Sequence, residues 1–494
     1  MSASLLLGFV VGYFVLLLAV AWWTSRRGDN DAFFIGNRNS PWGLVAFGMI
    51  GTSLSGVTFV SVPGTVALSQ FGYLQIILGQ VLGYAIVALV LLPLYYRHGL
   101  TSIYGYLQHR LGPRAYQTGA GIFIVSRTLG ATARLYLVVA VLQDMILNAF
   151  GVPFWLTAAV ILVMILLYTV EGGVRTIVYT DTLQTAGMLL GLLACIGFLL
   201  SQLDLSVTGS LQRLQSSGLS TVFDTEPQSR GWFAKQIVAG IFITIAMTGL
   251  DQEMMQKSLS VRRLADSQKN LLVLGVVLLV VVSLFLILGG LLTLRASDLG
   301  LTIAGDRLFP TLVLTTMPVA LQVLFVIALV SALFPSADGA LTALTSSFCI
   351  DLLGLKQRPD LSQARIATLR RRVHLSFAAL FLALVMAFHA LADPSMIGLI
   401  LKIAAYTYGP LLGLFAFGIF TRRMPADRWV PVVALAAPAL CWLIDANQRL
   451  LFGAWELGLE LLLLNGALTF AGLWIVSARR VARAVVVGEV AASD

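Results

Sequence analysis

Charge is scarce in this chain. Only 11% of its 494 residues are Asp, Glu, Lys or Arg, whereas 58% are apolar, and the mean hydropathy is +0.91. A water-soluble fold cannot bury so large an apolar fraction, which excludes a soluble globular protein. Apolar runs of about 20 residues, the length that crosses a ~30 Å hydrocarbon core, recur along almost the whole chain. The sequence predicts an all-α, multi-pass protein of the inner membrane, because helices satisfy their own backbone hydrogen bonds in lipid.

Cysteine, histidine and long polar segments are also scarce. Three cysteines lie in apolar segments without CxxC or metal-type spacing, which argues against a redox or metal centre: Cys195, Cys349 and Cys441. Four scattered histidines form no His/Glu metal pair, and no Ser/Lys dyad faces across the predicted spans, so we expect no enzyme and no cofactor. The longest polar segment, about 203–231, is too short for an appended catalytic domain.

Apolar runs separated by charged residues or Gly/Pro breaks predict thirteen membrane-spanning helices within a single transmembrane domain, 1–494. Their approximate ranges are 3–25, 42–69, 72–96, 116–145, 154–170, 176–202, 233–255, 270–294, 310–350, 373–393, 396–421, 428–446 and 456–477.

The net charge of +9 comes from short basic clusters between these spans rather than from one basic face, so we expect no nucleic-acid partner. One set of alternate loops holds most of the Lys and Arg residues, including Lys257, Arg262, Arg263 and Lys269. Because basic loops stay in the cytoplasm, the amino terminus is predicted outside and the carboxyl terminus inside.

A charged side chain at the centre of a span costs on the order of 2.5–3.5 kcal/mol on insertion scales, so such residues are functional candidates. The candidates are Arg127, Arg134, Lys402, Asp181, Asp251 and Asp338. The ordinary interpretation is that some of them form structural pairs or lie near span ends. This interpretation fits Arg127 and Asp251 best and Lys402, inside a continuous apolar run, least.

The second span is rich in Gly, Ser and Thr between Phe47 and Gly64. Small residues permit close helix packing, but a helix broken near its middle is the sharper interpretation, since free carbonyls there could bind a cation. The ninth span offers a counterpart, because Pro335 removes a backbone hydrogen bond. Ser336 and Asp338 beside it, and Asp181 on another helix, supply the hard oxygen ligands of a cation cradle.

In the order and spacing of several segments, the chain resembles the sodium:solute symporter family over nearly its full length. These segments are Phe33–Gly36 with the broken second span, Leu100–Tyr104, Tyr168–Gly173, Gly249–Gln256 and Asp338–Asp351. The resemblance implies a leucine-transporter-type fold of two inverted five-helix repeats, about 42–202 and 233–421, with peripheral helices 3–25, 428–446 and 456–477.

The resemblance also implies the site residues. A primary sodium site matches Gly51, Leu54, Ala332, Pro335 and Ser336, of which Pro335 departs from the family pattern because it has no hydroxyl. A second sodium site in some members matches Asp181 with Asp338 and Gly339. Substrate-lining positions match Ser53, Thr58, Gln80, Thr244 and Lys402.

The expected function is sodium-coupled symport of a small organic solute by alternating access, with sodium as the coupling ion. The Lys402 ammonium, and with it Arg134, favours an anionic solute such as a carboxylate or sugar acid. Proton coupling through Asp181 or Asp338 stays open, as does a transporter-fold sensor or scaffold without coupling. We expect a monomer or a weak homo-oligomer in the lipid bilayer.

Overall fold

The computed structural model describes residues 3–25, 33–34, 36–303, 305–355, 358, 360–391, 396–453, 455 and 457–479. The helices of the first half are α1 (Ala3–Ser25), α3 (Trp42–Ser69), α4 (Tyr73–Ile86), α5 (Leu92–Arg97), α6 (Gly105–Arg110), α7 (Pro113–Met145), α8 (Phe154–Gln202) and α9 (Val207–Ser216). Those of the second half are α10 (Phe233–Thr244), α11 (Gln252–Leu259), α12 (Leu264–Asp298), α13 (Leu308–Thr316), α14 (Val319–Ser347), α15 (Gln363–Leu391), α16 (Met396–Phe420), α17 (Val430–Ala446), α18 (Gln448–Phe452) and α19 (Leu461–Ile475). Strands β1 (Arg423–Pro425) and β2 (Ser477–Arg479) form an antiparallel pair.

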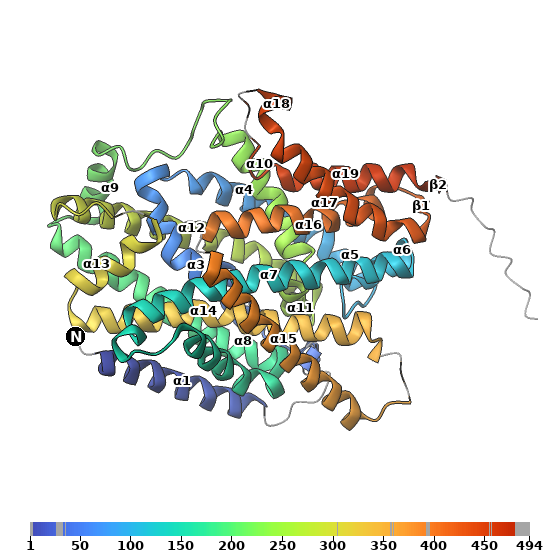
Figure 1. The fold of residues 1–494 in the computed structure, drawn as a ribbon, viewed down its shortest axis with the longest axis horizontal. Coiled ribbons are helices and arrows are strands. Elements are labelled where there is room, and N and C mark those ends of the chain that lie inside the picture. The colour runs from blue at the N-terminus through green and yellow to red at the C-terminus, as the bar shows by residue number, and fades with distance from the viewer. Residues whose placement is uncertain are drawn as a thin grey trace, which may run out of the picture.

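Within the described residues, ten helices are long and apolar enough to cross a membrane. An eleventh span results if the bent pair Phe233–Gly249 and Gln252–Leu259 is counted as one. Two shorter apolar helices cover Phe154–Val170 and Leu461–Ile475. Most of the long helices run in roughly one direction, with α1 along one margin and α17 and α19 along the other (Figure 1). The prediction of a helical, multi-pass membrane protein is confirmed.

The outward faces of the peripheral helices carry large apolar side chains. Leu89, Leu190 and Leu435 are 63%, 61% and 73% exposed. Water would penalise such a surface, whereas lipid accepts it without cost. The exposed leucines therefore mark the faces that contact hydrocarbon.

The predicted spans 154–170 and 176–202 match two helices, Phe154–Val170 and Thr176–Gln202, which meet within α8 at a kink at Gly173 (φ 53°, ψ −155°), a conformation that glycine adopts readily. One predicted span differs from the structure. The predicted span 310–350 begins with a separate helix, α13, because the chain is extended at Met317 and Pro318 and α14 starts after them. Proline favours the extended conformation at the residue before it.

The centre of the bundle is occupied by α3, which packs against α8, α12 and α14, while α14 also packs against α7. The Gly- and Ser-rich second span thus lies at the protein's core and not against lipid. Its residues between Val45 and Val66 are almost all buried.

Helices α4 and α10 approach each other closely at two glycines. A methyl group on Gly79 would overlap the carbonyl of Ile237, and one on Gly240 would overlap the carbonyl of Ile76. The two backbones therefore touch, which small residues permit in membrane bundles.

We predict that Gly79→Ala lowers the thermal stability of the purified protein, since overpacking of this kind costs about 1–3 kcal/mol. Gly197→Ala is the matched control, because a methyl group there meets nothing within 4 Å. Thermal unfolding in detergent checks both variants. Equal melting temperatures for the native chain and Gly79→Ala would contradict the close contact.

Candidate functional site

The first feature of the site is a break in α3 at Ser55, where φ is 35° and ψ is 164°. A positive φ at a residue with a side chain costs of order 1–3 kcal/mol and recurs at functional sites. Ser55 is buried, 4% exposed, so the freed backbone groups around it lie inside the protein. The prediction of a helix broken near its middle is confirmed.

A second break lies between α10 and α11 rather than at Pro335. A π-helical turn, Ile245–Gly249, ends α10, and α11 leaves at an angle of 65°. Asp251 caps the new helix, because its Oδ1 accepts from the backbone N–H groups of Glu253 at 2.9 Å and Met254 at 3.3 Å.

Two tyrosine hydroxyls donate hydrogen bonds to backbone carbonyls at the second break. Tyr95 donates to the Gly249 carbonyl at 2.7 Å, and Tyr104 donates to the Leu250 carbonyl at 3.1 Å. These bonds satisfy oxygens that the helix has released, as a buried break in a membrane requires.

The expectation of an interrupted helix at Pro335 is wrong, because α14 is continuous from Val319 to Ser347 with Pro335 inside it. The proline still leaves the Ser331 carbonyl without its helical donor. Ser336 Oγ donates to the Leu333 carbonyl at 2.8 Å, which leaves its lone pairs available to a ligand.

The break in α3 adjoins this part of α14. A methyl group on Gly51 would lie 3.5 Å from Pro335 Cγ, and one on Gly56 would lie 3.7 Å from the backbone nitrogen of Leu333. The Gly51 N–H donates to Thr185 Oγ1 on α8 at 3.2 Å. The structure thus brings together the helix segments that carry Gly51, Leu54, Ala332 and Ser336.

A cavity of about 120 Å³ lies beside the α3 break. Four residues predicted to contact substrate line it: Ser53, Thr58, Gln80 and Thr244. Two guanidinium groups, those of Arg127 and Arg134, line it as well. Apolar side chains from α4, α10, α12 and α16 complete the wall, so the cavity joins a polar side to an apolar one, as ligand pockets do.

Lys402 does not line this cavity. Its side chain is 62% exposed, and its ammonium lies 3.7 Å from Asp445 Oδ2 in a separate pocket between α16 and α17. The preceding residue, Leu401, lines both the central cavity and this second pocket.

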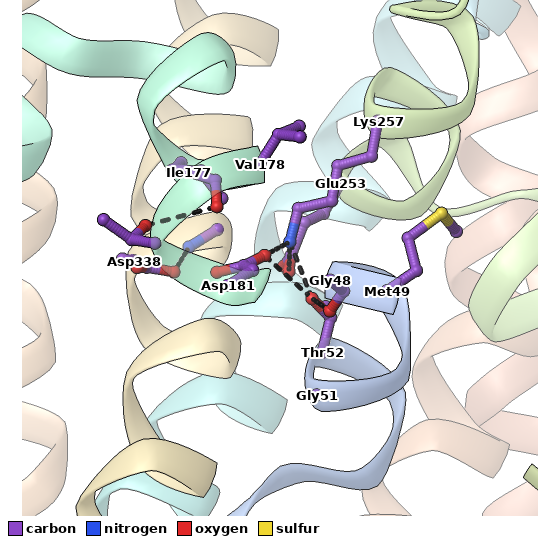
Figure 2. A network of polar contacts seen from close by, with 12 residues as sticks. Gly48, Met49, Gly51, Thr52, Ile177, Val178, Asp181, Glu253, Lys257 and Asp338 are labelled. Atoms are coloured by element: carbon purple, nitrogen blue, oxygen red, sulfur yellow. Dashed lines mark hydrogen bonds and ion pairs between the residues drawn. The ribbon is translucent and has the colours of Figure 1, made fainter. Parts of the chain in front are cut away.

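A buried ionic network runs behind the cavity (Figure 2). The Lys257 ammonium contacts Asp181 Oδ2 and Thr52 Oγ1, each at 2.7 Å, and lies 3.7 Å from Glu253 Oε1. Thr52 also lines the cavity, so the network and the cavity share a residue.

Arg127 extends the network toward the second break. Its guanidinium pairs with Glu253 and lies 3.7 Å from Asp251 Oδ2, which accepts from the Tyr408 hydroxyl at 2.6 Å. Arg127 and Asp251 are thus both structurally paired, in agreement with the ordinary interpretation of these two charges. Arg134 has no ion-pair partner within the part of the chain that the structure describes.

Asp338 lies on α14 at the other side of Asp181 (Figure 2). Its carboxylate accepts from the Tyr168 hydroxyl at 2.8 Å and from the Gly339 N–H. Gly339 has to lack a side chain, because a methyl group there would overlap the Glu253 carboxylate and lie 3.1 Å from Lys257 Nζ.

Sequence reasoning missed Lys257 and Glu253. Lys257 was assigned to a cytoplasmic loop, but it is 3% exposed and belongs to α11. The signal was the spacing of Glu253 and Lys257, four residues apart without an intervening Gly or Pro, which places both on one helix face.

The chain is similar to known proteins over most of its length. The sequence pattern of the sodium:solute symporter family matches residues 33–427. The chain belongs to this family. It is 26% identical to the human sodium/iodide cotransporter over 440 residues, covering 86% of this chain and 67% of that protein. It is 24% identical to the sodium/sialic acid symporter NanT of Aliivibrio fischeri, covering 92% and 91%.

A solved structure of a sodium-coupled sialic acid symporter in a substrate-bound, outward-open state shares the fold. Its TM-score is 0.82 at 18% identity, over 95% of this chain and 97% of that one. A symporter of this family is a sodium-coupled secondary transporter and not an enzyme. The present symporter is accordingly a multi-pass protein of the inner membrane.

We predict that Arg127→Gln strongly destabilises the symporter, because removing one partner of a buried ion pair costs about 3–5 kcal/mol. Glu253→Gln in the Arg127→Gln background should restore part of the loss, since it removes one stranded carboxylate. Thermal unfolding of the single and double variants measures this coupling. Additive losses would contradict a direct pair.

Proposed function

We propose that the symporter transports a small organic anion with sodium through the central cavity. We infer the substrate class from Arg134, whose guanidinium lines the cavity and has no carboxylate partner among the described residues. An unpaired cation inside a membrane protein is costly, and an incoming carboxylate offers a bidentate partner. Relatives described as sodium/sialic acid symporters carry a sugar acid, which is an anion of this kind.

The polar side chains that line the central cavity restrict the chemical class of the substrate further. Hydroxyl and amide groups of Ser53, Thr58, Gln80 and Thr244 can bind the hydroxyl or carbonyl oxygens of a solute. The volume of about 120 Å³ is small beside the ~300–1,000 Å³ of drug-sized pockets. A short hydroxylated or keto carboxylate, or a compact sugar acid, meets both conditions.

For sodium, we propose the backbone carbonyls of Gly51, Leu54 and Ala332 together with Ser336 Oγ. The break at Ser55 frees oxygens on α3, and its close approach to Leu333 and Pro335 sets α14 against them. Hard oxygen donors suit an alkali cation. Pro335 lacks a hydroxyl, but the Ser331 carbonyl that it releases can contribute an oxygen in its place.

We further propose thirteen membrane spans in two inverted five-helix repeats, 42–202 and 233–421, around this site. The ten long helices, the bent pair and the two shorter apolar helices supply that number. The two breaks support the repeat, because each proposed repeat begins with a broken helix: α3 in the first, and α10 with α11 in the second. An outside amino terminus, a cytoplasmic carboxyl terminus and a monomer or weak homo-oligomer complete the proposal.

We predict that uptake requires sodium and that Ser336→Ala raises the half-saturating sodium concentration about tenfold, which corresponds to ~1.4 kcal/mol for one lost ligand. Ser283→Ala is the control, because Ser283 makes a similar bond, to the Leu279 carbonyl at 2.7 Å, on α12. Uptake into proteoliposomes under a sodium or a potassium gradient, at constant pH on both sides, gives the measurement. Full uptake without sodium would contradict sodium coupling.

We predict that Arg134→Gln reduces the affinity for the anionic substrate by at least tenfold, because a charge-assisted bond contributes about 1.5–3 kcal/mol. Lys402→Gln tests the other cation and should leave affinity nearly unchanged, since Lys402 pairs with Asp445 outside the cavity. Substrate-induced thermal shifts, screened against monocarboxylates and sugar acids in sodium, measure both. The reverse outcome would assign the substrate carboxylate to Lys402.

A further inference from the structure

The Lys257 ammonium is placed as a bound metal cation would be. Its oxygen neighbours come from three separate helices: Thr52 Oγ1 on α3, Asp181 Oδ2 on α8 and Glu253 Oε1 on α11 itself. Hydroxyl and carboxylate oxygens converging on one point are the donors that small hard cations select. The Lys257 side chain is 4% exposed, so the ammonium is shielded from bulk solvent.

The group of residues around the Lys257 ammonium also contains a carboxylate oxygen that is free to bind a cation. Asp181 Oδ1 is buried and has no hydrogen-bond donor among the residues that the structure describes. Four carboxyl groups gather here, those of Asp181, Asp251, Glu253 and Asp338, beside three cations, Arg127, Arg134 and Lys257. Without the ammonium, Asp181 would lose its cationic partner, and a low-dielectric interior does not tolerate an unpaired carboxylate.

The ammonium also lies close to the proposed sodium site. Thr52, which it contacts, follows Gly51 directly, and Thr185, which accepts from the Gly51 N–H, lies one helical turn after Asp181. One turn of an α-helix is about 5.4 Å, so the ammonium and the proposed sodium site are neighbours along α8. Lys257 itself is carried by α11, beyond the 65° bend.

We propose that Lys257 is a tethered cation that permanently occupies a second cation site formed by Thr52, Asp181 and Glu253, so that the native symporter binds a single sodium ion. Asp181 then serves the ammonium and is not a ligand of the transported sodium. This inference rests on the proposed sodium site and specifies its stoichiometry.

The test measures how many sodium ions each purified variant binds. Lys257→Gln removes the tethered charge and should open the second site, so that purified protein binds about two radiolabelled sodium ions where the native chain binds about one. Lys257→Arg keeps the charge and should stay at one. Adding Asp181→Asn to Lys257→Gln removes the site and should return the number to one. An unchanged number in Lys257→Gln would overturn the proposal.

If Lys257→Gln does not fold, a second variant still tests the proposal. Asp181→Asn alone, with Lys257 intact, should still bind one sodium ion, because Asp181 faces the ammonium. Loss of that ion would make Asp181 a sodium ligand and overturn the proposal. A native chain that binds no sodium at all would instead contradict the proposed function, so the two failures are distinguishable.

Discussion

The buried ion pair between Lys257 and Asp181 links α11 to the central helices α8 and α3 of this symporter. It connects α11, which follows the second helix break, to α8, and through Thr52 it reaches α3 just before the first break. A buried pair of this kind adds little net stability, because desolvation of the two charges offsets their attraction. What it provides is a fixed relation between two interrupted helices, since separating the partners would strand a charge in the membrane interior.

The breaks themselves follow from the demand that no backbone polar group face lipid unpaired. Each is buried, and the second is satisfied by groups from distant segments: the Asp251 carboxylate caps α11, while Tyr95 and Tyr104 take the released carbonyls. The first break, at Ser55, lies in a helix that packs against α8, α12 and α14, and it adjoins Pro335 and Leu333 of α14. This is the break at which we propose the sodium site.

The cavity and the ionic network share two residues. Arg127 pairs with Glu253 and also lines the cavity, and Thr52 contacts the Lys257 ammonium and also lines the cavity. A solute in the cavity, as proposed, would therefore lie one side chain away from the network. Such proximity gives an electrostatic route by which the cation and the solute can favour the same arrangement of helices, as symport requires.

The sequence by itself determined the class of protein, the position of most helices and the family, because apolar length and the order of motifs depend only on neighbouring residues. It also located the broken second span through the Gly, Ser and Thr residues around Ser55. Tertiary structure decided which charges meet. Lys257 follows the predicted span 233–255, and Glu253 lies at the end of that span, so both resemble residues near a loop until α11 turns back into the protein. Lys402, by contrast, lies in an apolar run yet points to Asp445. Pro335 lies inside α14, which continues from Val319 to Ser347. Side-chain direction and the partners across helices are properties of the packed bundle, and no local pattern of residues encodes them.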